Sequence, residues 1–326
     1  MYEFLDINNY QIPSVGLGLW KIDKSATAKV VTNAIEIGYR HLDSAADYGN
    51  EKEVGVGLAE AINKGYCRRE EVWITSKLWN NYHRKEHVRP ACERTLKDLG
   101  LDYIDLYLIH FPISLQFVSF KDQYPPGWII NSKKNKKNIM NIDPVPLAET
   151  WQGMEKLVQA GLVRQIGICN YNSGLLNDLM AYASIKPAML QIESHPYLTQ
   201  ENLIHHAHNL DIAVTAFSPL GSLSYVSLKM AKVEDSLLKQ SEIIKIAENL
   251  KRTPAQVVLR WGIQRRTAII PKTSRIDKLR ENITLFGFEL NADQMNKISA
   301  LNINYRFNDP ANFCEKAFGK FYSIYD

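Results

Sequence analysis

Side chains that can perform acid–base chemistry stand at the ends of predicted strands in the first third of the chain. Asp43, Lys77 and His110 each end or directly follow a short apolar run, and Tyr48 lies in the loop after Asp43. Because the carboxyl ends of parallel strands meet at one face, we expect these side chains to converge. Alone, an aspartate at a strand end more often caps a helix, a lysine is more often solvated, and a histidine more often forms a structural hydrogen bond. The prediction therefore rests on the joint placement of these residues.

These four residue types fit proton donation to a carbonyl group. A tyrosine with an ordinary pKa of about 10 is a poor acid at neutral pH. We expect the cationic Lys77 to lower the pKa of Tyr48, and Asp43 to hold that lysine charged and in place. His110 would orient a carbonyl oxygen by a hydrogen bond. Together they predict protonation of a carbonyl oxygen as its carbon receives hydride.

Eight short apolar runs that alternate with amphipathic helices would position these residues. Most of the runs are continuously hydrophobic, which is typical of strands buried on both faces. The pattern predicts an α/β fold, a (β/α)8 barrel with a small N-terminal hairpin around Asn8-Asn9. Long connections at 111–145 and 218–240 follow strand ends, which predicts loops at the C-terminal face. A third long segment, the tail from 302 to 326, follows the last helix. The eight runs are Ser14–Leu17, Tyr39–Leu42, Val72–Ser76, Ile104–Ile109, Val163–Ile168, Met189–Ile192, Ala213–Phe217 and Thr267–Ile270.

Length and composition fit a single barrel domain over residues 1–326. The net charge of +4 and the 45% hydrophobic residues exclude disordered and collagen-like chains. The one dense lysine run, at 133–137, is typical of a solvated loop, so we expect no nucleic-acid partner. No apolar segment is long enough to span a membrane, and four cysteines without a CxxC pair predict reduced thiols. With no basic, apolar leader at the N-terminus, these features predict a cytoplasmic protein that binds no metal, as a monomer or homodimer.

A phosphate site is predicted after the eighth run rather than after the first. The chain contains no G-x-G-x-x-G motif and no P-loop motif. Lys272, Arg275 and Lys278 surround a predicted helix start, with Ser274 as the expected N-cap. A helix N-terminus with cations around it favours phosphate, although a capped and solvated helix explains the same residues.

The chain resembles the aldo-keto reductases over essentially its whole length. The segments that carry the resemblance are 38–45 with 48–51, 75–79, 108–112, 166–171 and 270–274. The resemblance implies Tyr48 as the general acid, Lys77 and Asp43 as the residues that tune it, and His110 as the substrate orienter. It also implies a barrel that binds NADP(H) in extended form without a Rossmann motif.

The resemblance further implies a set of cofactor contacts. Lys278 stands where the family usually has arginine, so NAD(H) is kept as an alternative cofactor. The implied contacts are Lys272, Thr273, Ser274 and Lys278 at the adenosine 2′-phosphate, Glu281 and Asn282 at the adenine, Ser218, Leu220 and Ser222 at the pyrophosphate, Cys169, Asn170 and Gln191 at the carboxamide, and Phe217 stacked on the nicotinamide.

Substrate preference is predicted from more local resemblances. Segments 111–113, 124–127 and 306–310 look like D-xylose reductases, which implies that Asn308 binds a sugar hydroxyl. Segments 161–171, 192–197 and 258–265 lean toward aldose-6-phosphate reductases, which need a further cationic pocket that the Lys133–Lys137 run could supply. The predicted substrate-binding residues are Trp20, Trp79, His110, Phe111, Trp128 and Asn308.

We therefore predict NAD(P)H-dependent reduction of an aldose to its alditol. Aldose-6-phosphate reduction is the alternative. A non-catalytic barrel subunit is a third reading, which the presence of all four acid–base residues disfavours.

Overall fold

The computed structural model describes residues 3–130 and 139–325 of the chain. Eight parallel strands pair in chain order, from β3 to β10. Val15 bridges Ile269 in parallel, and the Gly16 amide donates to the Ile269 carbonyl at 2.8 Å, so the first and last strands close the barrel. The strands are β3 Leu17–Gly18, β4 His41–Asp43, β5 Trp73–Leu78, β6 Ile104–Ile109, β7 Val163–Cys169, β8 Met189–Glu193, β9 Ala213–Phe217 and β10 Thr267–Ile269.

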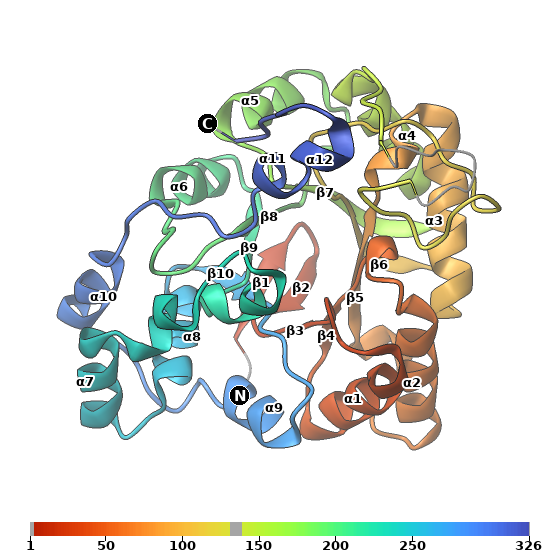
Figure 1. Cartoon of the computed structure of the whole chain (residues 1–326). Coiled ribbons are helices and arrows are strands. Elements are labelled where there is room, and N and C mark those ends of the chain that lie inside the picture. The colour runs from red at the N-terminus through yellow and green to blue at the C-terminus, as the bar shows by residue number, and fades with distance from the viewer. Residues whose placement is uncertain (1–2, 131–138, 326) are drawn as a thin grey trace.

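The predicted barrel is thus confirmed, although its first strand is shorter than expected. A side chain at Gly18 would place its Cβ 2.6 Å from the Ile270 carbonyl oxygen, so the close approach that seals the barrel requires glycine there. The predicted N-terminal hairpin is also present, with β1 (Phe4–Ile7) and β2 (Tyr10–Pro13) paired antiparallel. Ile7 and Ile12 pack against the inner side chains of β6 and β8, so the hairpin closes the N-terminal end (Figure 1).

Helices connect the strands and cover the outside of the barrel (Figure 1). Local signals explain where several begin: the Asp23 carboxylate accepts from the Ser25 amide at the start of α1, and Thr253 and Gln256 form a capping box at the start of α8. The helices are α1 Lys24–Ile37, α2 Glu51–Asn63, α3 Lys85–Leu99, α4 Leu147–Gln159, α5 Ser173–Tyr182, α6 Glu201–Asn209, α7 Ser241–Leu250, α8 Pro254–Gln264, α9 Ile276–Ile283, α10 Ala292–Ser299, α11 Pro310–Phe313 and α12 Glu315–Phe318.

The described parts of the two long connections lie at the C-terminal face, as predicted, because residues of both line the cavity there. The segment after β9 forms four short 3-10 helices, η4 Gly221–Ser224, η5 Val226–Leu228, η6 Val233–Asp235 and η7 Leu237–Lys239. The chain after α10 runs back to the barrel and places α11 and α12 beside β7 and β8 in the view of Figure 1. The lysine run at 133–137 lies outside the described residues. Among the helices of the described chain, none is long and apolar enough to cross a membrane.

Candidate active site

Three neighbouring strands bring the predicted acid–base residues to one place. Asp43 ends β4, Lys77 lies one residue before the end of β5, and His110 directly follows β6. Tyr48 ends the short 3-10 helix η1 (Ala46–Tyr48), which follows β4. Gly49 then adopts a φ of +72°, so the chain turns sharply and leaves the Tyr48 ring over the barrel mouth.

A buried ion pair lies beside the Tyr48 hydroxyl. The Lys77 ammonium donates to Asp43 Oδ1 at 2.6 Å and to the Ser44 carbonyl at 2.8 Å. Its third donor points to Tyr48 Oη at 3.3 Å. Both charged side chains are only 1% exposed, and Gln191 Nε2 donates to the second Asp43 oxygen at 2.7 Å. Lys77 is therefore held by two acceptors in a geometry that directs positive charge at the phenol oxygen.

The prediction that the pKa of Tyr48 is lowered is wrong. Burial raises the pKa of Tyr48 well above its ordinary value, and the nearby Asp43 and Asp47 carboxylates raise it further. The reason is that the phenolate would have to form in a low-dielectric site that already contains two acids. The Tyr48 phenol therefore keeps its proton at neutral pH, which is the state that a proton donor needs.

His110 lies between this centre and an aromatic wall. Its ring centroid is 6.0 Å from that of Tyr48, 5.2 Å from Trp79 and 4.9 Å from Phe111. Asp47 Oδ1 is 3.1 Å from His110 Nδ1. The backbone is fixed as well, because Asn170 Nδ2 donates to the His110 carbonyl at 2.8 Å. These contacts orient the imidazole beside the Tyr48 ring.

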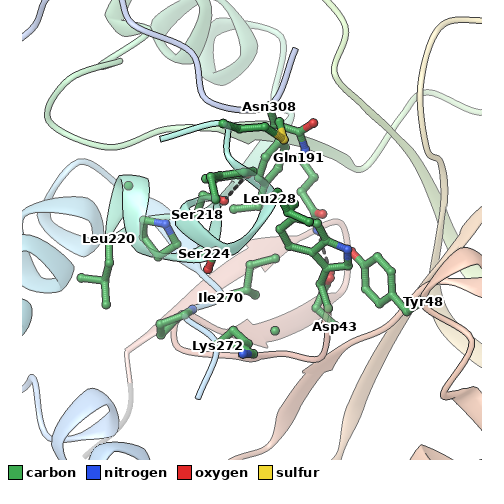
Figure 2. Close-up of a pocket in the computed structure, with 18 of the residues that line it drawn as sticks. Asp43, Tyr48, Gln191, Ser218, Leu220, Ser224, Leu228, Ile270, Lys272 and Asn308 are labelled. Atoms are coloured by element: carbon green, nitrogen blue, oxygen red, sulfur yellow. Dashed lines mark hydrogen bonds between the residues drawn. The ribbon is translucent and has the colours of Figure 1, made fainter. Parts of the chain in front are cut away.

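A cavity of about 480 Å³ opens above these residues (Figure 2). It brings together most of the residues that the sequence predicts for catalysis and for the nicotinamide and substrate ends. Its predicted lining residues are Trp20, Asp43, Tyr48, His110, Phe111, Trp128, Asn170, Gln191, Phe217, Ser218, Leu220, Lys272 and Asn308.

Four predicted residues lie behind the cavity wall instead. Lys77 reaches the site only through Asp43 and Tyr48, while Cys169 and Ser222 are buried and do not line the cavity. Trp79 is 1% exposed, and its indole N–H donates to the Gly127 carbonyl at 3.3 Å. Trp79 supports His110 and Trp128 from behind, so its prediction as a substrate contact is not met by this geometry.

The predicted phosphate end lies beyond Lys272 and differs in one local detail. Helix α9 begins after Arg275, and Arg275 rather than Ser274 is its N-cap residue. The predicted Ser274 cap is wrong, because Thr273 Oγ1 accepts the Arg275 amide and thereby forms the turn before the helix. Thr273, Ser274, Lys278, Glu281 and Asn282 lie on this segment, away from the cavity.

The cations near this end fit a dinucleotide phosphate. Burial lowers the pKa of Lys272, and burial together with Lys272 lowers the pKa of Lys21. Lys21 Nζ donates to the Ser224 carbonyl at 2.8 Å and to Ser227 Oγ at 2.7 Å. Among the described residues neither lysine has a carboxylate within 4 Å, so an anion between them would relieve their repulsion.

Cationic side chains at the start of α9 are paired with acids. Arg275 donates to both carboxylate oxygens of Asp277, and Lys278 donates to Glu281. Thr253 Oγ1 also donates to Glu281, at 2.8 Å. A phosphate group at this end would have to compete with the exposed Arg275–Asp277 pair, which contributes little to stability, and with the partly buried Lys278–Glu281 pair.

A buried acid next to the catalytic loop has an unusual environment. Glu51 begins α2 and is 3% exposed; Ser76 donates to its Oε1 at 2.6 Å and Thr95 to its Oε2 at 3.2 Å. Burial raises the pKa of Glu51 to about 7, and Asp98 and Asp47 add to the rise. Because the folded pKa lies above the unfolded one, the resulting stabilisation is present below about pH 4.5 and is lost as pH rises to about 7.

We predict that Glu51→Gln removes this pH dependence. The variant has near wild-type stability at pH 5 and is more stable than wild type at pH 8, by up to about 3 kcal/mol. Thermal unfolding of both proteins between pH 5 and 8 measures the difference. Burial lowers the pKa of His41 to about 4 and that of His83 to about 3, so these histidines make the protein more stable as pH rises. They contribute equally to both proteins and do not affect the difference. A stability difference that does not change with pH would contradict the prediction.

The structure adds residues that the sequence reasoning missed. Asp47 lines the cavity beside His110. Its position directly before Tyr48 in the sequence could have identified it as a site residue. Tyr225, Met230 and Phe313 also line it, from the segment after β9 and from α11. No periodic pattern marks these three. Within the described ranges, no cluster of three His, Cys, Asp or Glu residues could hold a metal ion.

Comparison with known proteins places this geometry in a family. Residues 14–303 match the aldo/keto reductase family model. A probable NAD(P)H-dependent D-xylose reductase of Aspergillus fumigatus is 48% identical over 305 residues, 93% of this chain and 95% of that protein. An NADPH-dependent D-xylose reductase of Meyerozyma guilliermondii is 46% identical with the same coverage. The crystal structure of a Bombyx mori aldo-keto reductase in complex with NADP has a TM-score of 0.83 and 34% identity, covering 96% of this chain and 97% of that one.

The match spans every strand of the barrel and each of the strand ends described above. The chain belongs to the aldo/keto reductase family.

Proposed function

We propose that this protein reduces the aldehyde group of an aldose, of the D-xylose type, to the alditol with NADPH. The observation that carries the proposal is the Asp43–Lys77–Tyr48 chain, in which a protonated phenol faces the cavity and a buried cation supports it from behind the wall. The similarity to D-xylose reductases supports the substrate class. The non-catalytic alternative leaves this costly buried charge pair without a purpose.

The residues of this chain perform the proton half of the reaction. When bound, the dihydronicotinamide of NADPH would supply the hydride for the carbonyl carbon. Tyr48 donates its phenolic proton to the carbonyl oxygen, so that the C=O group becomes a C–H and an O–H. Lys77 stabilises the phenolate that forms 3.3 Å away, and Asp43 keeps the ammonium in place. His110 holds the carbonyl oxygen at the Tyr48 hydroxyl.

The walls of the cavity suit a small polyhydroxy aldehyde. Trp20, Phe111 and Trp128 supply apolar surface, and Asn308 offers an amide that both donates and accepts hydrogen bonds. For the aldose-6-phosphate alternative a second cation is needed near the substrate. Among the described lining residues Lys272 is the one lysine or arginine, and it lies toward the cofactor end, so the free aldose is favoured.

A direct assay tests the proposal. We expect oxidation of NADPH by the purified protein with D-xylose, at a higher kcat/KM than with a hexose 6-phosphate. A preference for the phosphorylated sugar would replace the proposed substrate by the alternative. Absence of turnover with either sugar and with a simple aldehyde would overturn the enzymatic proposal itself.

Cofactor selectivity should depend on Lys278. We predict that Lys278→Ala weakens NADPH binding about 10- to 100-fold, the usual effect of losing one charge-assisted hydrogen bond, and leaves NADH binding nearly unchanged. Quenching of tryptophan fluorescence measures both affinities. Lys245→Ala is the control, because Lys245 pairs with Glu242 on the distant helix α7. Equal weakening of both cofactors would place Lys278 away from the 2′-phosphate.

We further propose a single-domain cytoplasmic enzyme that acts as a monomer or homodimer. Its four cysteines support the location, because all are buried free thiols.

A further inference from the structure

Glu193 is a buried carboxylate that the mechanism above does not use. It ends β8 and is 0% exposed. Its two oxygens each accept a backbone N–H from a segment far along the chain: Phe307 donates to Oε1 at 2.8 Å, and Asn308 donates to Oε2 at 2.9 Å. His195 Nε2 lies 2.9 Å from Oε1. The carboxylate therefore joins the end of a barrel strand to the returning C-terminal segment.

The bonding around Glu193 makes this connection rigid. A buried carboxylate is very costly unless hydrogen bonds replace its hydration. In the described part of the chain, His195 is the one basic residue within 4 Å of it. The two backbone N–H groups thus provide much of the compensation, and the carboxylate stays on them as long as the barrel is folded.

A second anchor acts on the neighbouring side chain. Phe307 is 3% exposed, and its ring stacks on Tyr225 with centroids 5.7 Å apart and an interplanar angle of 11°. The rings of His195 and Tyr305 also contact it, at 5.3 Å and 4.9 Å. The next residue, Asn308, lines the cavity (Figure 2). The Phe307–Asn308 backbone is therefore fixed both by its hydrogen bonds to Glu193 and by the packing of the Phe307 ring.

We propose that Glu193 is a positioning residue that sets the preference for hydroxylated aldehydes, by holding the Phe307–Asn308 backbone so that the Asn308 amide meets a substrate hydroxyl. The inference rests on the proposed function, because it takes the substrate to be an aldose. Among the described residues, the Glu193 carboxylate forms no hydrogen bond or ion pair with Asp43, Tyr48 or Lys77. Loss of its two backbone bonds should therefore leave the carbonyl chemistry intact. Its effect should appear only with substrates that carry hydroxyl groups.

The substitution Glu193→Gln tests this with almost no change in shape. The glutamine amide nitrogen replaces one acceptor and faces an N–H donor, so one of the two backbone bonds is lost. We expect kcat/KM for D-xylose and for glyceraldehyde to fall about 10- to 100-fold, mainly through KM. For butanal, which has no hydroxyl group, kcat/KM should stay within about threefold of wild type. The NADPH Kd should not change.

Two further variants separate positioning from general damage. Asp105→Asn is the matched control, because Asp105 is also a buried carboxylate that accepts a backbone N–H, from Ile74, but near the N-terminal end of the barrel. It should lower stability without changing the ratio of xylose to butanal. In an Asn308→Ala background, adding Glu193→Gln should change the xylose kcat/KM little further, because both substitutions remove one interaction.

Each outcome decides between the inference and the proposed function. Equal losses for all three aldehydes, or none, would overturn the role of Glu193 while the wild-type xylose activity still supports aldose reduction. If wild type reduces glyceraldehyde and butanal but not xylose, the proposed aldose substrate fails, and the glyceraldehyde-to-butanal ratio still tests Glu193. If Glu193→Gln does not fold, hydrogen exchange of the Phe307 and Asn308 amides in wild type decides, since exchange at unprotected rates would overturn the inference.

Discussion

Replacement of Tyr48 by phenylalanine is expected to lower kcat for aldehyde reduction about 100- to 10,000-fold, the usual contribution of a positioned general acid. The substitution removes one hydroxyl group from the cavity wall and keeps the ring. Lys77 keeps its bonds to Asp43 and the Ser44 carbonyl, so the fold should be unaffected. Steady-state kinetics with D-xylose and with butanal measure the loss, which should be similar for both because the missing proton goes to the carbonyl oxygen.

The NADPH affinity of the Tyr48→Phe protein provides the control. Its Kd should stay within about twofold of wild type, because the lost hydroxyl group acts on the substrate. Trp20→Phe changes another part of the cavity wall conservatively and should retain most of the activity. Its kcat shows how much such a change of the wall lowers the rate when the proton donor is kept. A Tyr48→Phe enzyme with near wild-type kcat would assign the proton to another donor, with His110 as the next candidate by position.

The parts of the site that lie on regular strands could be predicted from the sequence. Continuous hydrophobic runs mark buried parallel strands, and the carboxyl ends of such strands must meet, so Asp43, Lys77 and His110 followed from pattern alone. Tyr48 needed one more step, because it lies in a loop. Tyr48 is separated from Asp43 by only a few residues in the sequence, so a chain of that length must keep it near the mouth of the barrel.

The sequence did not predict whether a residue near a strand end lines the cavity or packs behind its lining, because tertiary contacts decide this. Trp79 directly follows β5, as His110 directly follows β6. Its indole nevertheless packs behind His110, because the Gly127 carbonyl from the long connection accepts its N–H. Ser274 has the residue type of an N-cap, but the neighbouring Thr273 forms the turn. The pKa of Tyr48 rises mainly because the phenol is buried, and burial depends on the whole fold.

The segments that return over the barrel mouth were the hardest to predict. Residues 218–240 form only short 3-10 helices, which have no hydrophobic period of their own and depend on tertiary contacts. Tyr225 lies against Phe307, a contact between positions that share no local pattern. The Glu193 carboxylate likewise accepts from the backbone N–H groups of Phe307 and Asn308, and backbone donors cannot be recognised from the residue types.

The buried pair of Asp43 and Lys77 leads to the prediction with the largest expected effect on stability. Lys77→Met leaves the Asp43 carboxylate without its cation at 1% exposure, and Asp43→Asn leaves the Lys77 ammonium without its anion. Each single substitution should destabilise the protein by about 3–5 kcal/mol, because an unpaired charge remains buried. In thermal unfolding of a chain of 326 residues this corresponds to a fall in Tm of roughly 4–7 °C.

The double variant Asp43→Asn with Lys77→Met should be more stable than either single one, because no charge then remains in the low-dielectric interior. Its kcat should nevertheless stay as low as that of Lys77→Met, since nothing stabilises the Tyr48 phenolate. Recovery of stability without recovery of activity would separate the two roles of the pair, one in the fold and one at the phenol oxygen. Additive losses of stability would mean that the two charges do not compensate each other, and the ion pair would then not be what holds Lys77 against Tyr48.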